Sequence, residues 1–166
     1  MERRPRKSNQ DSPREPREFD QKVVEVKRVT RVVAGGKRMR FRALVVIGDH
    51  KGRVGMGLKK GLDVAESVNK AVNQAKKNLV SLPLFNDTIP HEVNVKYKSS
   101  RLILKPGKPG QGIVAGGAVR SVMDLAGVKN VMSKMLGSSN KVNNIKAVFA
   151  AFKSMKSKDQ LSQMRK

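Results

Sequence analysis

The sequence of 166 residues contains no cysteine and no tryptophan, and its only aromatic residues are one tyrosine and five phenylalanines. Without cysteine, disulfide bonds and thiolate metal sites are impossible. The two histidines, His50 and His91, lie far apart in the chain and cannot form a zinc site without carboxylate ligands. We interpret both as ordinary loop or strand residues, and we expect no metal and no cofactor.

Long apolar runs are also missing. No stretch of about 18 apolar residues occurs, and no signal-peptide core lies near Met1. The sequence therefore predicts a soluble, cytoplasmic protein without a membrane partner.

Acidic residues are scarce: 13 Asp and Glu stand against 36 Lys and Arg, which gives a formal net charge of +23. A compact fold with this excess repels itself unless a polyanion neutralises it. The basic residues are spread through segments with folded patterns and are not collected on one amphipathic helix, so the charge favours nucleic acid over a membrane surface.

Catalytic patterns are absent as well. The sequence shows no evident pair of carboxylates for general acid and base chemistry and no Gly-x-Ser-x-Gly elbow. These absences predict a non-enzymatic protein with no catalytic residues and no small-molecule substrate.

The composition changes along the chain divide it into four segments. Residues 1–19 hold three prolines among mixed charges and no apolar residue between Met1 and Phe19, so they are expected to form a disordered tail. This tail is either an arm that orders on RNA or a plain solvated extension. Residues 20–82 and 83–155 are predicted to be two small domains, and residues 156–166 a basic, frayed tail.

Residues 20–82 show the pattern of three strands and a helix. A first strand over residues 22–33 loses its alternation at Val29, which indicates a bulge or twist there. A second strand over residues 39–47 has one alternating face, predicted to pack, and an opposite face with Arg40 and Arg42 that can meet phosphate. The packing face holds Met39, Phe41, Ala43, Val45 and Ile47.

A turn cluster at residues 48–52 predicts a hairpin into a third strand. Asp63, with Glu66 three residues later, is typical of a helix N-cap with a capping box. The apolar stripe of this helix, which should cover the sheet, is Val64, Val68, Ala71, Val72, Ala75 and Leu79. Pro83 ends the unit.

Residues 83–155 predict strands near 91–97 and 101–105, a helix over 117–126 ended by Gly127, and a short strand over 130–135. A last helix should begin at Lys141 with Asn140 as its cap.

The segment 28–38 is the strongest candidate for RNA contact. The pair Gly35 and Gly36 lets the backbone approach phosphate, and the flanking basic side chains neutralise it. The alternative is a hairpin turn whose glycines serve only the backbone conformation, with a solvated basic rim. Few aromatic residues are available for stacking, so we expect structured RNA to be recognised by shape and phosphate. The candidate RNA-binding residues are Lys27, Arg28, Thr30, Arg31, Gly35, Gly36, Lys37, Arg38, Arg40, Arg42, Lys51, Arg53, Lys59 and Lys60.

Residues 105–117 form a glycine-rich stretch before a predicted helix, which is typical of an anion cradle. Its glycine spacing meets neither the dinucleotide pattern nor the P-loop pattern. Docking of RNA or protein is the favoured interpretation, with a purely structural loop as the alternative.

Several ordered motifs together resemble the small-subunit ribosomal protein five family. They are residues 28–41, 45–57, 110–120, 124–128 and 137–140, and the likeness covers about residues 20–155. The resemblance implies an α+β fold: an N-terminal domain like the double-stranded-RNA-binding fold, with a three-stranded sheet plus a helix, then a C-terminal α/β two-layer domain with a left-handed crossover.

The resemblance also implies a structural constituent of the small ribosomal subunit that binds rRNA, stabilises the head relative to the body and supports translational accuracy. The implied partners are rRNA and small-subunit ribosomal proteins four and eight, with the path by which mRNA enters nearby. Residues 30–37 would lie near rRNA. The residues expected to dock protein four are Gly110, Gly112, Gly116, Gly117 and Arg120.

Two other functions compete with this reading. A free double-stranded-RNA-binding protein or RNA chaperone would bind generic duplexes with steep salt dependence, but no helix is predicted before the first strand. A small phosphotransferase using the glycine-rich stretch would be stabilised by ATP with magnesium.

Overall fold

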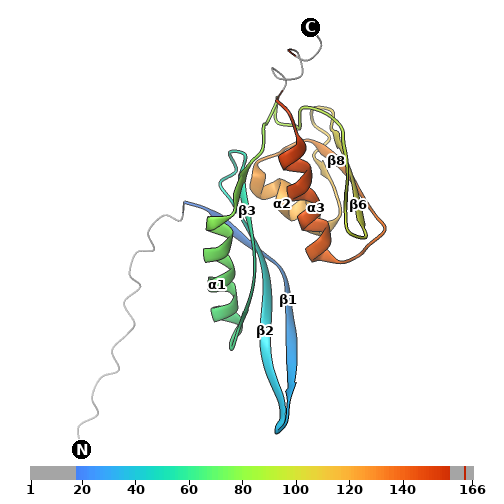
Figure 1. Cartoon of the computed structure of the whole chain (residues 1–166). Coiled ribbons are helices and arrows are strands. Elements are labelled where there is room, and N and C mark those ends of the chain that lie inside the picture. Colours follow the sequence, from blue (N-terminus) through green and yellow to red (C-terminus); the bar gives the residue numbers. More distant parts are fainter. Residues whose placement is uncertain (1–17, 158–162, 164–166) are drawn as a thin grey trace, which may run out of the picture.

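The structure is a computed structural model and describes residues 18–157 and residue 163 (Figure 1). The predictions for the two tails fall largely outside these residues. The described chain runs in the order β1 (Asp20–Val33), β2 (Gly36–Gly48), β3 (Arg53–Gly61), α1 (Val64–Lys77), β4 (Leu79–Ser81), β5 (Val93–Tyr97), β6 (Ser100–Pro106), β7 (Ile113–Val114), α2 (Gly117–Ala126), β8 (Val131–Leu136) and α3 (Lys141–Ser154).

The first sheet is antiparallel, in the order β1-β2-β3-β4, and α1 packs on one of its faces. The three predicted strands and the helix are confirmed, and a fourth, short strand was missed. Leu79, assigned from the sequence to the helix stripe, instead begins β4, because α1 ends at Lys77. The predicted bulge exists, but its position at Val29 was wrong: the register shifts between Val23 and Glu25.

Both faces of β2 are buried in its second half. Ala43, Val45 and Ile47 pack under α1, as predicted. Leu44 and Val46 point the other way into the larger core shared with the second half of the chain. The prediction that this opposite face is free for phosphate is therefore wrong beyond Arg42, because a second domain covers it.

The second sheet is mixed, in the order β5-β6-β8-β7, with β7 parallel to β8 and the other pairs antiparallel. The chain crosses from β7 to β8 through α2; the left hand expected for this crossover stays a prediction. Figure 1 shows α2 and α3 between the two sheets, where they bury residues such as Val122, Met123 and Phe152. The predicted α+β architecture is confirmed, and β7 is the strand of this second sheet that was missed.

The helix ends follow the sequence signals with one exception. The Asn140 side chain accepts a hydrogen bond from the Val142 N–H at 3.1 Å, and Gly127 ends α2 with φ +80°. Asp63 stands at the N-cap of α1, but its side chain makes no capping bond. Glu66 instead accepts the N–H of Leu62 at 2.6 Å.

The turn between β2 and β3 joins the two halves. The N–H groups of His50 and Gly52 donate to the carbonyls of Leu125 and Ala126, at 3.0 and 2.9 Å. These carbonyls lie at the C-terminal end of α2, where helical partners are missing. The turn thus fixes the position of the first sheet relative to the second half.

The described part of the chain contains no helix with the length and apolar character needed to span a membrane.

Candidate RNA interface

The hairpin of β1 and β2 projects beyond the rest of its sheet (Figure 1). Pairing between β1 and β2 continues to Val33 opposite Gly36, whereas β3 stops at Gly61 opposite Phe41. Residues 29–40 therefore form a two-stranded ribbon, closed by a two-residue turn at Ala34 and Gly35. Gly36 adopts φ +133°, a conformation that favours glycine.

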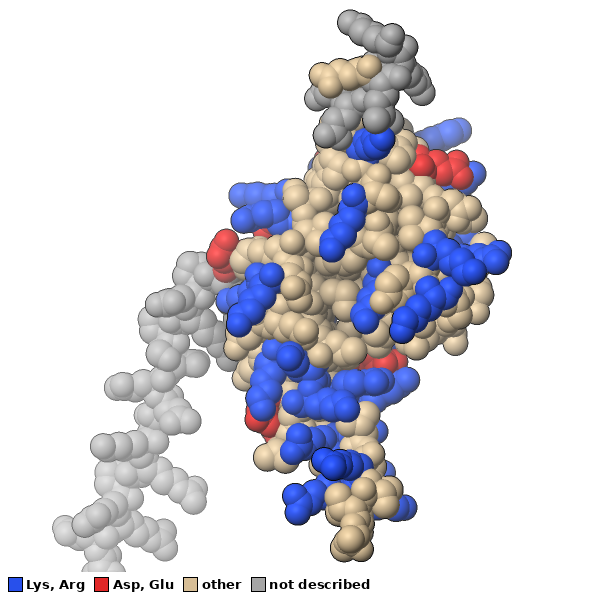
Figure 2. Space-filling model, viewed as in Figure 1, with Lys and Arg blue, Asp and Glu red and all other residues tan. Residues whose placement is uncertain are grey.

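One face of this ribbon carries most of its cations. Residues opposite each other in antiparallel strands share a face, and Arg31 faces Arg38 while Lys27 faces Arg42. Arg42 in turn faces Lys60 of β3. We define the basic face as Lys27, Arg31, Arg38, Arg40, Arg42 and Lys60. Figure 2 shows basic side chains crowded along the ribbon.

The basic face is hollowed and largely unneutralised. A hollow of about 530 Å³ is lined by Arg31, Arg38, Arg40 and Lys60 together with Thr30 and two valines, Val29 and Val33. Among the described residues, Lys27 alone of the basic face forms an ion pair, with Glu25 at 3.5 Å. The sequence-based set omitted both valines, although alternation along β1 places them on the same face as Arg31.

By strand register the opposite face of the ribbon holds the predicted residues Arg28, Thr30 and Lys37, although Thr30 also lines the hollow of the basic face. Two large apolar side chains, Val32 and Met39, are 74% and 54% exposed there. The predicted loop residues are thus divided between two faces, and Arg31 and Lys37 point in opposite directions.

Lys51 and Arg53 lie away from the ribbon tip. Lys51 lies in the β2–β3 turn and Arg53 begins β3, at the other end of β2. Twelve residue steps of strand correspond to about 40 Å. Arg53 is engaged by Asp49 at 2.7 Å and by Glu18 at 3.7 Å, and lies 5.4 Å from the Phe19 ring centroid. Lys51 and Arg53 were predicted to act with the hairpin because they are close to it in the sequence. In the structure they lie far from the hairpin tip.

Asp49 organises this turn. Its carboxylate accepts the N–H groups of Lys51 and Arg53 at 2.8 and 3.0 Å as well as the Arg53 side chain. Burial raises the pKa of Asp49, but the hydrogen bonds from Arg53 and the two N–H groups outweigh it and hold that pKa below its ordinary value. The ionised carboxylate therefore keeps Arg53 in place.

The glycine-rich stretch brings the predicted docking residues to the two ends of the short strand β7. Gly110 and Gly112 adopt φ +85° and +74°, and the Gly112 N–H donates to Asn130 Oδ1 at 3.1 Å. Gly116 is the N-cap of α2, Gly117 opens the helix, and Arg120 is exposed on it. Among residues 18–157 and 163, no group of three or more His, Asp or Glu is placed to hold a metal ion.

Both halves of the chain match known families. Residues 19–83 match the family model described as ribosomal protein S5, N-terminal domain, and residues 95–165 match the one described as ribosomal protein S5, C-terminal domain. The two matches follow in the same order as the two halves of the structure and together span most of the chain. The chain belongs to the ribosomal protein S5 family, a family of structural, RNA-binding proteins of the small ribosomal subunit that takes part in translation.

Proposed function

We propose that this chain holds rRNA through the basic face of its β1–β2 ribbon, stabilises the head of the small subunit relative to the body, and thereby supports translational accuracy. The observation that carries the proposal is the alignment of six cations on one face, five of them without an ion pair among the described residues. Such a surface neutralises phosphate and loses affinity as salt rises.

The rigid attachment of the ribbon supports the bracing role. The β2–β3 turn is hydrogen bonded to the end of α2, and Leu44 and Val46 are fully enclosed in the core that the two halves share. RNA held at the ribbon is therefore fixed relative to the second half. Protein docking on the second half would complete the brace: protein four at the surface from Gly110 to Arg120, and protein eight elsewhere. In this proposal the chain works in cytoplasmic ribosomes and lies near the path by which mRNA enters.

Sedimentation of a cell lysate in magnesium-containing buffer, with the chain followed by mass spectrometry, tests the RNA contact. We expect the wild-type chain to comigrate with small subunits through a moderate salt wash. Arg31→Glu with Arg38→Glu should reduce its occupancy, because negative charge then faces phosphate. Lys76→Glu with Lys134→Glu, which changes the net charge equally away from the ribbon, is the matched control and should keep occupancy.

Normal occupancy of the Arg31 and Arg38 double variant would sink the assignment of the basic face. A wild-type peak among free proteins or other RNA complexes would favour a free double-stranded-RNA-binding protein or an RNA chaperone. For the bracing role, a reporter of misreading in cells that carry the double variant should show a raised error rate.

A further inference from the structure

The outer edge of β3 is open over half of its length. β4 pairs only with residues Arg53 to Gly55, so residues 56–61 have no strand on that side. α1 lies on one side of this open edge and α3 on the other (Figure 1). The edge therefore forms the floor of a channel between the two halves of the chain.

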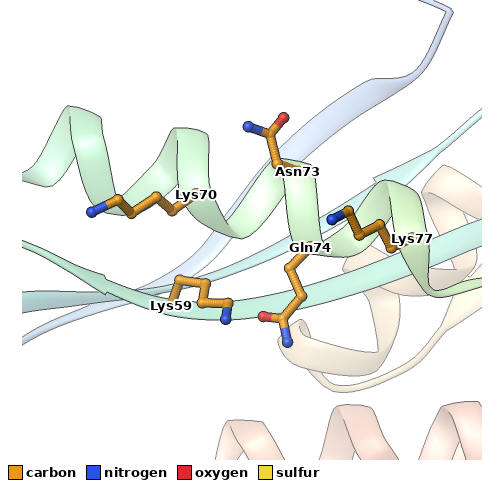
Figure 3. A pocket seen from close by; sticks show the side chains of 5 residues that line it. All are labelled: Lys59, Lys70, Asn73, Gln74 and Lys77. Atoms are coloured by element: carbon orange, nitrogen blue, oxygen red, sulfur yellow. The ribbon is translucent and has the colours of Figure 1, made fainter.

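Two hollows meet along this edge. The first, of about 290 Å³, is lined by Lys59, Lys70, Asn73, Gln74 and Lys77 (Figure 3). The second, of about 560 Å³, shares Gln74 and Lys77 and adds Lys146 and Lys153 from α3 over apolar side chains such as Met56 and Phe149. Because two residues line both hollows, we treat them as one feature, the edge groove.

Five lysines surround the edge groove: Lys59, Lys70, Lys77, Lys146 and Lys153. Lys70 pairs with Glu66, and the other four have no ion pair within the part of the chain that the structure describes. On each helix the two lysines are seven residues apart, about 10.5 Å along the axis, which is far enough to contact separate phosphates. Figure 2 shows basic side chains over α1 and α3 on this side of the molecule.

Lysines beside an open strand edge also prevent edge-to-edge pairing. That role explains Lys59, which lies on the strand itself. It does not explain Lys153, or Lys146, whose Nζ also lies 5.8 Å from the Tyr97 ring centroid; both come from a helix of the other half and line the same groove.

The groove is built for polar contact, not for an added strand. Gln74 extends from α1 toward β3, and its Oε1 accepts the N–H of Leu58 at 2.9 Å (Figure 3). A partner strand would have to displace this bond to pair with the edge. Part of the lining is apolar, with Phe149 7% exposed and Leu79 37% exposed. Ammonium groups and side-chain amides remain, and these donate to phosphate and ribose oxygens.

We propose that the edge groove is a second RNA-binding surface, which holds the backbone of a structured rRNA segment across the junction of the two halves. It is separate from the hollow of the basic face, because the two surfaces share no lining residue. Its lysines come from α1, β3 and α3, so one RNA segment bound there ties the two halves together.

Charge reversal tests this proposal on the purified full chain with small-subunit rRNA. Lys77→Glu with Lys153→Glu should weaken binding about tenfold or more and lower the salt slope by about 1 for each lost contact. The matched control is Lys76→Glu with Lys134→Glu, which has the same net charge but leaves the groove intact and should bind within about threefold of wild type. An equal loss in both double variants would show a net-charge effect only and overturn the proposal.

A cross-link identifies the occupant directly. The chain has no cysteine, so Asn78→Cys places a single thiol beside the groove for a short aryl-azide photo-crosslinker. In assembled small subunits we expect cross-links to rRNA, and their loss when Lys77→Glu and Lys153→Glu are added. Cross-links to protein alone, or none in fully occupied subunits, would overturn the proposal whatever the ribbon variants show.

Discussion

Arg31 and Arg38 stand directly opposite each other in the β1–β2 ribbon, on the same face and beyond the last residue of β3. Like charges in this arrangement repel and destabilise a strand pair. The chain keeps two guanidinium groups side by side where no carboxylate of the described residues pairs with them. This arrangement is unfavourable for the free protein and becomes favourable when phosphate lies between them.

Arg38→Gln should therefore have opposite effects on folding and on binding. Removing one of the facing charges is expected to raise the free energy of unfolding of the free chain by about 0.2–1 kcal/mol. The same variant should bind small-subunit rRNA more weakly, with a salt slope smaller by about 1. Urea unfolding and filter binding measure the two effects. A variant that loses both stability and affinity would mean that Arg38 serves the ribbon itself.

Gly48 lies at a close approach of the two halves. A Cβ at Gly48 would lie 2.1 Å from the carbonyl oxygen of Leu125, a backbone atom that cannot move aside alone. Gly48→Ala should lower the free energy of unfolding by about 1–3 kcal/mol or more, because it pushes α2 off the β2–β3 turn. Gly35→Ala is the control: nothing lies within 4 Å of its Cβ, and the change should stay within about 0.5 kcal/mol. Equal urea midpoints for the two variants would contradict this contact.

Ser100 and Ser133 give a matched pair in the second sheet. Ser100 Oγ donates to Asn144 Oδ1, and both side chains are 1% exposed. Ser100→Ala leaves the Asn144 oxygen without this donor and should cost about 1–3 kcal/mol. Ser133 Oγ is buried and has no hydrogen-bond partner among the described residues. Ser133→Ala should therefore be neutral or slightly stabilising in the same thermal or urea unfolding measurement, and a cost as large as that of Ser100→Ala would refute the difference.

Asp49 should make the stability of the fold depend on acid. Its pKa in the folded chain lies below the ordinary value of 3.8, so the unfolded chain binds a proton first as the pH falls. The contribution is complete above the unfolded pKa and is lost as the pH falls through the folded pKa, in a window below about pH 5. Asp49→Asn should be less stable at neutral pH and should lose less stability on acidification. Parallel curves of unfolding free energy against pH for the two proteins would disprove this role.

The local signals in the sequence were strongest where helices begin and end. Gly127 and Asn140 end and begin their helices as predicted, because a left-handed backbone and a side-chain cap each depend on one residue. The short strands β4 and β7 escaped prediction, since two or three residues carry no measurable alternation. They exist only because a longer strand lies beside each of them.

In the candidate site, too, local features were predictable and features that depend on distant parts of the chain were not. Alternation along β2 already set Arg40 and Arg42 apart from the packing side chains. It could not tell that Leu44 and Val46 on the same face are covered by the second half, because burial of a strand face depends on what the rest of the chain places over it. Nor could it tell that Arg31 and Lys37 face opposite ways, which depends on the register between two strands.

The sequence by itself determined the excess of positive charge, the absence of thiol chemistry, the order of most strands and helices, and the family, since each of these lies in composition or in contiguous motifs. Only the tertiary structure decided which cations act together. It aligned Arg31 with Arg38, removed Lys51 and Arg53 to the far end of β2, and brought Lys77 of α1 to the same groove as Lys153 of α3. Salt screens exposed charges beyond about 10 Å. Such proximity between residues far apart in the sequence comes from strand register and packing, not from position along the chain.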